Sequence, residues 1–193
     1  IGDFKESILD VVENCNVDRL LVEPTGVAKL SDIKKAFEDK DLKNIAEVEK
    51  SITVVDAEKF NLYLSNFKSF FDNQIKNADI IVFAGVYFMA QSAKLLNPDK
   101  KVLLPNMNSG CFMSDMIGLS QLREFRAKYP GVPAVCYINS TAEVKAECDI
   151  CCTSSNALDV VRSLKAEKIL FLPDAYLGKW IERKISNLKV ITY

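Results

Sequence analysis

Short runs of apolar and β-branched residues alternate with longer amphipathic stretches along almost the whole chain. The apolar runs predict strands at residues 19–23, 51–56, 79–83, 101–105, 133–138, 149–153, 168–172 and 189–192. Between them, apolar residues recur at helical spacing and predict helices at residues 4–14, 60–76, 89–96, 120–128 and 157–164. This alternation predicts an α/β fold of mainly parallel sheet with helices on both faces, built as one or two three-layer units.

Residues 132–157 carry the clearest chemical signal in the sequence. They contain two predicted strands, and each strand runs directly into polar, hydroxyl-rich residues that open a helix. Backbone N–H groups at a helix start are unpaired and carry partial positive charge, so carboxylates and phosphates bind there. Ligands of parallel sheets bind at the carboxyl ends of the strands. We therefore expect a pocket for a small anionic ligand at this edge of the sheet.

Composition narrows the classes of function. The 193 residues suffice for one large α/β domain or two small ones, and the net charge of −1, from 25 basic and 26 acidic residues, argues against nucleic-acid binding. No apolar run approaches the roughly 20 residues of a transmembrane helix, and the N-terminus has no signal-peptide pattern. We therefore expect a cytoplasmic protein with no membrane partner. The absence of histidine excludes histidine-based catalysis and histidine-ligated zinc.

The cysteines lie mostly inside apolar runs, which indicates reduced thiols rather than a secreted disulfide framework. Cys148, Cys151 and Cys152 resemble a metal-binding motif in their spacing. However, strand alternation sends Cys151 and Cys152 to opposite faces, and no second cysteine pair lies at zinc-finger spacing. We expect these three thiols to be buried and inert. Glu143 and Lys145, on the helix between the two strands, are expected on its solvated outer face.

Several stretches after residue 78 share one order and spacing with a known family. They are Gly85-Val86-Tyr87-Phe88-Met89-Ala90, Leu95-Leu96-Asn97-Pro98-Asp99-Lys100, Gly110-Cys111-Phe112-Met113-Ser114-Asp115-Met116, Tyr137-Ile138-Asn139-Ser140-Thr141-Ala142-Glu143-Val144-Lys145, Cys152-Thr153-Ser154-Ser155-Asn156 and Pro173-Asp174-Ala175-Tyr176-Leu177-Gly178. This part of the chain resembles quinolinate synthase, chiefly its middle domain. The resemblance implies a transferase of NAD biosynthesis that condenses iminoaspartate with dihydroxyacetone phosphate, using a [4Fe–4S] cluster.

The resemblance also implies roles for individual residues. Cys111 matches a cluster-ligating cysteine, Tyr137 and Asn139 match residues that contact substrate, and Ser154 matches a substrate-binding serine. The implied ligands are small anions, a dicarboxylate and a triose phosphate. Two alternatives stay open from the residues themselves: Cys111 as a half-buried loop cysteine, and Ser154 as a plain N-cap of the following helix.

Essential parts of the quinolinate synthase pattern are missing from this sequence. The family's early His-Asn-Tyr and Gly-Asp-Ser stretches, which contact substrate, have no counterpart. The family's second cluster cysteine would follow Tyr193, and the third lies further on. A single candidate ligand cannot hold a [4Fe–4S] cluster, which takes three or four thiolates. We expect this chain not to catalyse the reaction alone.

The first 82 residues do not share the resemblance to quinolinate synthase. Leu20-Leu21-Val22-Glu23-Pro24-Thr25-Gly26, Thr53-Val54-Val55-Asp56-Ala57 and Gln74-Ile75-Lys76-Asn77-Ala78-Asp79 resemble CobW-type GTPases. The resemblance implies that Glu23 lies beside Mg²⁺ and Gly26 beside the γ-phosphate of GTP. The alternative for this stretch is an ordinary strand followed by a Pro-Thr-Gly turn. The sequence lacks a phosphate-binding loop, a guanine-reading Asn-Lys-x-Asp and the CobW Cys-x-Cys-Cys, so nucleotide hydrolysis is not expected.

Three hypotheses follow from these patterns. The first is an incomplete quinolinate-synthase-like protein, with a CobW-like segment at 1–82 and a truncated quinolinate-synthase-like domain at 83–193. The second is a CobW-type GTP-binding metallochaperone fragment that uses Mg–GTP. The third is a non-catalytic α/β module whose exposed apolar surface drives oligomer formation.

Overall fold

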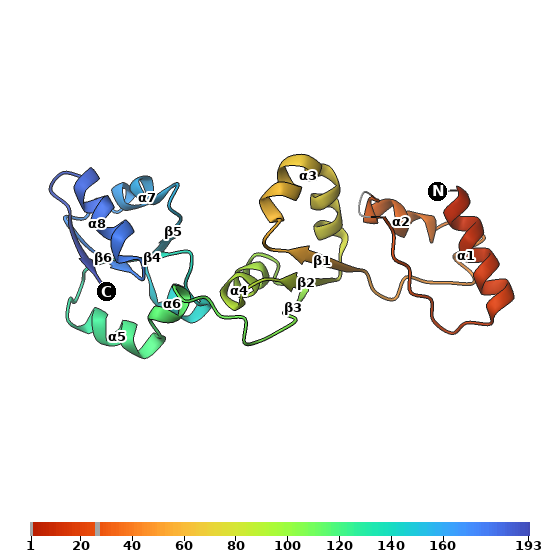
Figure 1. Ribbon diagram of the computed structural model, residues 1–193, viewed down its shortest axis with the longest axis horizontal. Helices are drawn as coiled ribbons and strands as arrows, with labels where there is room; N and C mark the ends of the chain where they lie inside the picture. Colours follow the sequence, from red (N-terminus) through yellow and green to blue (C-terminus); the bar gives the residue numbers. More distant parts are fainter. Residues whose placement is uncertain (1, 26–27) are drawn as a thin grey trace. The chain divides into compact units, whose positions relative to one another are not determined.

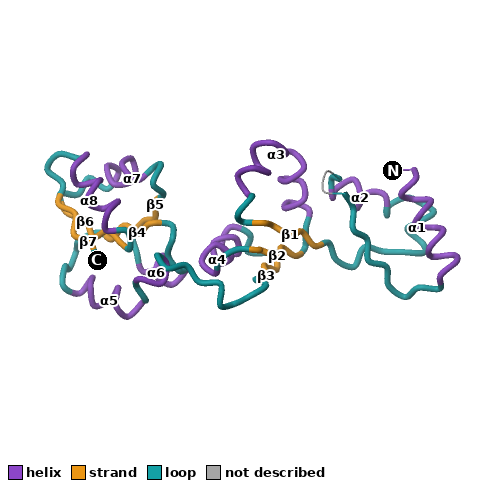
Figure 2. Tube along the Cα trace, viewed as in Figure 1, coloured by secondary structure: helices purple, strands orange, loops and turns teal. Residues whose placement is uncertain are grey.

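The computed structural model describes residues 2–25 and 28–193, in which helices alternate with parallel strands (Figure 1; Figure 2). The chain divides into a first unit, residues 1–84 and 97–105, and a second unit, residues 85–96 and 106–193. The fold class is α/β, as the hydrophobic pattern predicts. The assignment of 1–82 and 83–193 to domains of two families stays a prediction, because a division into compact units does not show which family each part belongs to.

The first unit forms its sheet from three short segments. Its elements are α1 (Gly2–Cys15), α2 (Leu30–Ala36), β1 (Ile52–Asp56), α3 (Phe60–Asn77), β2 (Ile80–Ala84) and β3 (Lys101–Leu103). The strands are parallel, in the order β1-β2-β3. Thr53 and Val55 of β1, like Ile81 and Phe83 of β2, are buried between more exposed neighbours, so one face of the sheet is covered. Helix α3 contacts β1, since Thr53 Oγ1 donates to Gln74 O at 3.0 Å.

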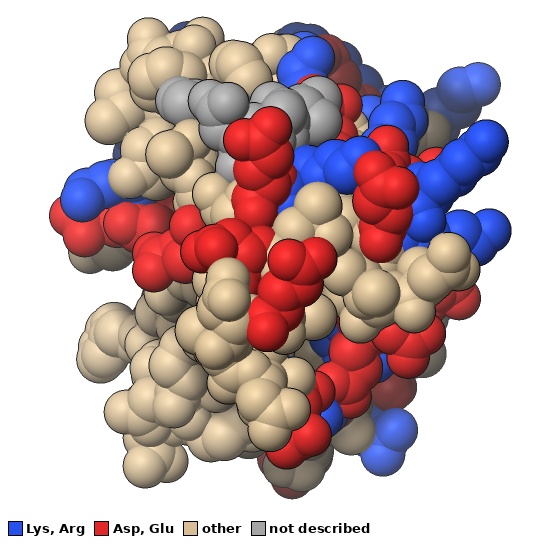
Figure 3. All heavy atoms as spheres, turned by 90° about the vertical axis from the view of Figure 1, so that its right-hand side faces the viewer, with Lys and Arg blue, Asp and Glu red and all other residues tan. Residues whose placement is uncertain are grey.

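Charges of both signs lie on the surface of the first unit. Lys5 Nζ lies 2.7 Å from Asp39 Oδ1 and 2.6 Å from Asp41 Oδ2, and Arg19 pairs with Glu49 at 3.0 Å. Figure 3 shows acidic and basic side chains side by side on one face of the molecule. Exposed pairs of this kind contribute about 0–1 kcal/mol each, so they do not hold the unit together.

The predicted strand at 19–23 is wrong. Residues 19–25 have no regular secondary structure, and Leu21 is 91% exposed. A strand needs a neighbouring strand for its backbone hydrogen bonds and a covered face for its apolar side chains. The sheets of the described residues give this segment no partner strand. An apolar run alone therefore does not form a strand here.

The second unit contains most of the regular structure. Its elements are α4 (Tyr87–Leu96), the 3₁₀ helix η1 (Ser114–Met116), α5 (Leu119–Ala127), β4 (Ala134–Tyr137), α6 (Ala142–Glu147), β5 (Ile150–Cys152), α7 (Ala157–Ser163), β6 (Lys168–Leu172), α8 (Ala175–Lys184) and β7 (Lys189–Thr192). The strands are all parallel, in the order β5-β4-β6-β7. In the part of the chain that is described, no helix is long and apolar enough to cross a bilayer.

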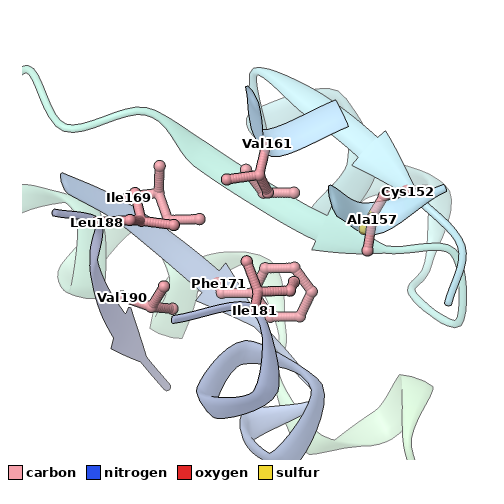
Figure 4. Packing of buried hydrophobic residues seen from close by; sticks show 9 residues of the cluster. Cys152, Ala157, Val161, Ile169, Phe171, Ile181, Leu188 and Val190 are labelled. Atoms are coloured by element: carbon pink, nitrogen blue, oxygen red, sulfur yellow. The ribbon is translucent and has the colours of Figure 1, made fainter. Parts of the chain in front are cut away.

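Helices cover both faces of the second sheet, with α7 and α8 on one side and α5 and α6 on the other (Figure 1). The larger core cluster lies beneath α7 and α8, where Figure 4 shows labelled members gathered between strands and helices. It consists of Val135, Cys152, Ala157, Val161, Ile169, Phe171, Ile181, Leu188 and Val190. On the opposite face, Cys136 and Leu172 pack with Leu122 of α5 and Val144 of α6. Because both faces are buried, the strands read as continuous apolar runs.

The hydrophobic pattern predicts most of these elements. The other predicted strands coincide with β1 to β7 within a few residues at their ends, and the predicted helices coincide with α1, α3, α4, α5 and α7. The short helix α6 follows β4, as the polar residues after that strand indicate. Helices α2 and α8 are not predicted by the pattern.

Candidate functional site

The chain makes a tight turn where β4 ends. Strands β4 and β5 pair in parallel, with Tyr137 opposite Cys152, and Ile138 N donates to Cys152 O at 2.8 Å. The buried Ser140 closes the turn, because its Oγ donates to Tyr137 O and its N–H to Ile138 O, both at 2.8 Å. This turn holds the half-buried Tyr137 and Asn139 at the carboxyl edge of the sheet.

The segment after β5 places Ser154 at the same edge. Helix α7 begins at Ala157, and Asn156 Oδ1 accepts hydrogen bonds from Thr153 N at 2.7 Å and Thr153 Oγ1 at 3.0 Å. Ser154 is exposed, and its hydroxyl has no hydrogen-bond partner among the described residues. The N-cap alternative for Ser154 is therefore wrong. Its hydroxyl is accessible to a ligand.

The strand order adds a second loop to this edge. In the sheet, β5 lies on one side of β4 and β6 lies on the other. The connection after β4 therefore runs to one side and the connection to β6 runs to the other, so the strand order reverses between β4 and β6. Ligands of parallel sheets bind where the order reverses in this way. The loop after β6 contains Asp174, whose Oδ1 caps α8 by accepting from Leu177 N at 2.9 Å. Next to it, Tyr176 is 86% exposed. The hydrophobic pattern does not reveal Tyr176, although the family stretch at 173–178 contains it.

Cys111 lies in the loop that precedes η1. It is partly exposed, and its carbonyl accepts from Asp115 N at 3.0 Å. A Cβ on the preceding Gly110 would lie 2.7 Å from Asp115 Oδ2, so a larger residue there would displace this exposed carboxylate. The described residues contain no group of three or more His, Cys, Asp or Glu side chains arranged to hold a metal ion. The donor set around Cys111 therefore does not by itself fit an iron–sulfur cluster.

The remaining thiols of the second unit divide between the two faces of its sheet. Cys152 packs in the core beneath α7 and α8, whereas Cys151 and Cys148 pack against the cluster beneath α5 and α6. The predicted alternation of Cys151 and Cys152 is confirmed. The expectation that all three thiols are buried holds for Cys152 and is wrong for Cys148 and Cys151, which are partly exposed. Hydrogen bonding to Cys148, together with burial, raises the pKa of the Cys136 thiol to about 12. Burial raises the pKa of Cys152 to about 11.

Lys145 does not lie on a solvated outer face, so that prediction is wrong. Its Nζ donates to Ser92 Oγ of α4 at 2.7 Å and lies 5.4 Å from the ring centroid of Phe88. Burial lowers the pKa of Lys145 below its ordinary value. Gln91 Oε1 also accepts from Ala142 N at 2.9 Å. These contacts attach α4 to α6, the helix that follows Asn139.

Glu143, the other residue expected on the outer face of α6, is exposed as predicted. Its own backbone amide hydrogen-bonds the carboxylate and holds its pKa below the ordinary value. Nothing in this geometry points to catalysis by Glu143.

The geometry around Glu23 gives little support to nucleotide binding. Glu23 is exposed in an irregular segment and does not end a strand, whereas an Mg²⁺-facing acid in such GTPases would follow one. Gly26 lies outside the described residues. Before that gap, Pro24 and Thr25 are exposed and have no regular secondary structure.

Comparison with known proteins identifies two families in the chain. The family described as quinolinate synthetase A protein matches residues 64–193. The family described as CobW/HypB/UreG, nucleotide-binding domain, matches residues 2–108. The matches overlap at residues 64–108, which include most of α3 and all of β2 and α4.

Similar proteins are named quinolinate synthase. The one from Alkaliphilus metalliredigens is 56% identical over 117 residues, which are 61% of this chain and 39% of that protein. The one from Dehalococcoides mccartyi is 56% identical over 117 residues, covering 38% of its length, and that of Aquifex aeolicus is 53% identical, covering 36%. This chain thus spans less than two fifths of these relatives. It belongs to the quinolinate synthetase A protein family through residues 64–193 and to the CobW/HypB/UreG nucleotide-binding family through residues 2–108.

Proposed function

We propose that this chain is an incomplete quinolinate-synthase-like protein. Its second unit retains part of the pocket in which a complete relative condenses iminoaspartate with dihydroxyacetone phosphate, in NAD biosynthesis. The chain alone binds small anions of this class without completing the reaction. We propose a cytoplasmic location and no membrane partner. We also propose no nucleic-acid partner, which the net charge of −1 favours.

The observation that carries this proposal is the convergence of three family-matched residues at one sheet edge. Tyr137 ends β4 and Asn139 follows it, and Ser154 follows the neighbouring parallel strand β5. A phenol hydroxyl, a carboxamide and an unpartnered serine hydroxyl together offer several donors to carboxylate or phosphate oxygens. Hydrogen bonds to a charged group are among the stronger ones, at about 1.5–3 kcal/mol each.

Cys111 is the proposed attachment point for iron in this family context. It supplies one thiolate, whereas a [4Fe–4S] cluster takes three or four. Any cluster at Cys111 therefore needs ligands that the described residues do not bring to it. We assign no catalytic step to the cluster in this chain.

The test is a titration of the ¹⁵N-labelled chain with malate and, separately, with dihydroxyacetone phosphate, followed by two-dimensional NMR. We expect shifts concentrated at residues 137–141 and 153–156. Ser154→Ala should weaken binding at least about fivefold, the equivalent of roughly 1 kcal/mol. Ser163→Ala is the matched control, since Ser163 lies at the other end of α7 and its Oγ donates to Val160 O. No shifts at the strand ends, or equal losses in both variants, would contradict the proposal.

A second candidate function is GTP binding by a CobW-type segment, which the match at residues 2–108 favours. It would place Mg–GTP near Glu23 and Gly26, with a phosphate-binding loop supplied from elsewhere. A ligand that binds only the folded state raises the melting temperature. Stabilisation by Mg–GTP but not by Mg–ATP would support this candidate. A chain that responds to neither GTP nor the two anions would instead be the non-catalytic, oligomer-forming module.

A further inference from the structure

Two thiols lie in contact on neighbouring strands, directly before the candidate site. Cys136 of β4 and Cys151 of β5 are partners in the parallel register, and their Sγ atoms are 3.1 Å apart. Adjacent strands are about 4.8 Å apart, which lies within the Cα separation of disulfides, about 4.4–6.8 Å. The two side chains point to the same face of the sheet, since both contact the cluster beneath α5 and α6. A covalent bond between them requires little backbone movement.

The two thiols differ in their access to solvent. Cys136 is fully buried on a central strand, whereas Cys151 is partly exposed on β5, the edge strand of the sheet. A small oxidant therefore reaches Cys151 first. Cys136 is then the nearest second thiol, in the position of a resolving cysteine. Cys148 is a further neighbour of Cys136, but it is not its strand partner.

We propose that Cys136 and Cys151 form a peroxide-oxidisable pair that closes a reversible cross-strand disulfide. In the first step the Cys151 sulfur attacks hydrogen peroxide, an S–O bond forms, the O–O bond breaks, and water leaves with the thiol proton. In the second step the Cys136 sulfur attacks the Cys151 sulfur, the S–O bond breaks, and hydroxide leaves as water with the Cys136 proton. The two thiols lose two electrons, which the peroxide gains. A dithiol reductant reverses the reaction.

The proposed disulfide would lie next to the strand ends that form the candidate site. Tyr137 follows Cys136 directly, and Cys152 and Thr153 follow Cys151. The disulfide would lock the two strands together one residue before the turn that holds Tyr137 and Asn139. Burial disfavours the thiolate that reacts, so the pair should oxidise more slowly than an exposed cysteine such as Cys15. The inference does not depend on the proposed function, because it concerns only these thiols.

The test uses the full chain, reduced and then exposed to hydrogen peroxide at low protein concentration. Remaining thiols are alkylated after denaturation, and the monomer is digested with trypsin and an aspartate-directed protease. Residues 129–145, 146–148 and 149–158 then separate Cys136, Cys148 and Cys151 into different peptides. We expect a link between 129–145 and 149–158, a mass loss of about 2 Da per bond, and reversal by dithiothreitol.

Variants identify the partner thiols. Cys148→Ser should keep the link, and Cys151→Ser should abolish it, with circular dichroism confirming that each variant is folded. A Cys152→Ser chain should also keep the link, because Cys152 faces the opposite side of the sheet. Full alkylation of Cys136 in the oxidised wild type, or a link from 129–145 to 146–148, would overturn the proposal. Where a variant fails to fold, fragmentation of the linked wild-type peptides by tandem mass spectrometry decides the matter, because it distinguishes a bonded Cys151 from an alkylated Cys152 within residues 149–158.

Discussion

At the scale of single residues, an aspartate side chain in each unit replaces a backbone carbonyl as a hydrogen-bond acceptor. Each aspartate lies just before a strand and accepts from a residue at or just before the start of the adjacent strand. Asp149 Oδ2 accepts from Ala134 N at 2.7 Å and from Arg126 Nη1 at 3.0 Å, and Asp149 N donates to Ala134 O at 2.9 Å. In the first unit, Asp79 Oδ2 accepts from Ser51 N at 2.8 Å in the same arrangement. Each carboxylate thus joins two strands before their regular pairing begins.

Replacing Asp149 with alanine should destabilise the second unit. The change leaves the amide of the fully buried Ala134 without its acceptor, which costs about 1–3 kcal/mol. The measurement is the free energy of unfolding in urea. Asp159→Ala is the control, because Asp159 is 84% exposed and its ion pair with Arg162 spans 3.5 Å. Equal losses in the two variants would show that the bond to Ala134 contributes nothing specific.

The stability of the second unit should fall in acid. The amide of Ala134 and then the guanidinium of Arg126 hold the pKa of Asp149 below its ordinary value of 3.8. A carboxyl group with a depressed folded pKa stabilises the fold above its unfolded pKa and loses that contribution as the pH falls through the folded value. Urea unfolding between about pH 6 and pH 2 should therefore show a loss below roughly pH 4. The loss should be shallower in Asp149→Asn, and an identical pH profile would contradict this assignment.

Some residue-scale features could be predicted from sequence and others could not. The alternation of Cys151 and Cys152 follows from strand periodicity, which is local. The contact of Lys145 with Ser92 joins residues that lie 53 positions apart, so no pattern around Lys145 reveals it. Ser154 has the residue type of an N-cap, but the choice of Asn156 as the cap depends on where β5 ends. The roles of Tyr137, Asn139, Ser154 and Cys111 in binding stay predictions.

At the scale of elements, α8 depends on a close approach that its sequence does not show. A Cβ on Gly178 would lie 2.7 Å from Thr192 Cγ2 of β7 and 3.2 Å from Phe171 Cδ1 of β6. The helix packs directly on the sheet because this position has no side chain. Glycine is about 1 kcal/mol less favourable than alanine inside a helix. The residues around Gly178 therefore give a weaker helix signal than the structure has.

Gly178→Ala should destabilise the second unit despite the better helix propensity. Overpacking costs about 1–3 kcal/mol, against a propensity gain of about 1 kcal/mol, so we expect a net loss of roughly 1 kcal/mol or more. Thermal unfolding followed by circular dichroism measures it. Thr192→Ser removes the methyl group that the new Cβ would meet, so the double variant should recover part of the loss. Lys179→Ala, at an exposed neighbouring position, should be close to neutral. A stabilised Gly178→Ala protein would contradict the packing.

The sheet elements show where pattern reasoning works and where it fails. Runs such as 168–172 become strands because β4 and β7 lie on either side and helices cover both faces. The run at 19–23 has similar composition but no partner strand among the described residues, and it stays irregular. Composition thus predicts a strand only where the rest of the fold supplies a neighbour.

At the scale of the whole molecule, the chain combines matches to two families and spans 39% or less of the quinolinate synthases compared. We predict that the isolated chain forms no quinolinate from iminoaspartate and dihydroxyacetone phosphate under anaerobic conditions. The proposed anion-binding groups lie at one sheet edge, but the sequence has only one candidate cluster thiolate and no histidine. The assay is chromatographic detection of quinolinate, with a complete quinolinate synthase as positive control. Turnover by this chain above the no-protein background would refute the prediction.

The most direct test of whether this chain can hold a [4Fe–4S] cluster by itself is an iron and sulfide count after anaerobic reconstitution. The wild type and Cys111→Ser are measured side by side. The oligomeric state of each sample is measured at the same time. Because one thiolate cannot hold a cluster that takes three or four, we predict no stable cluster on the monomer and no difference between the two proteins. A wild-type monomer that retains about four irons, all lost in Cys111→Ser, would contradict the account and show that the chain completes the metal centre itself.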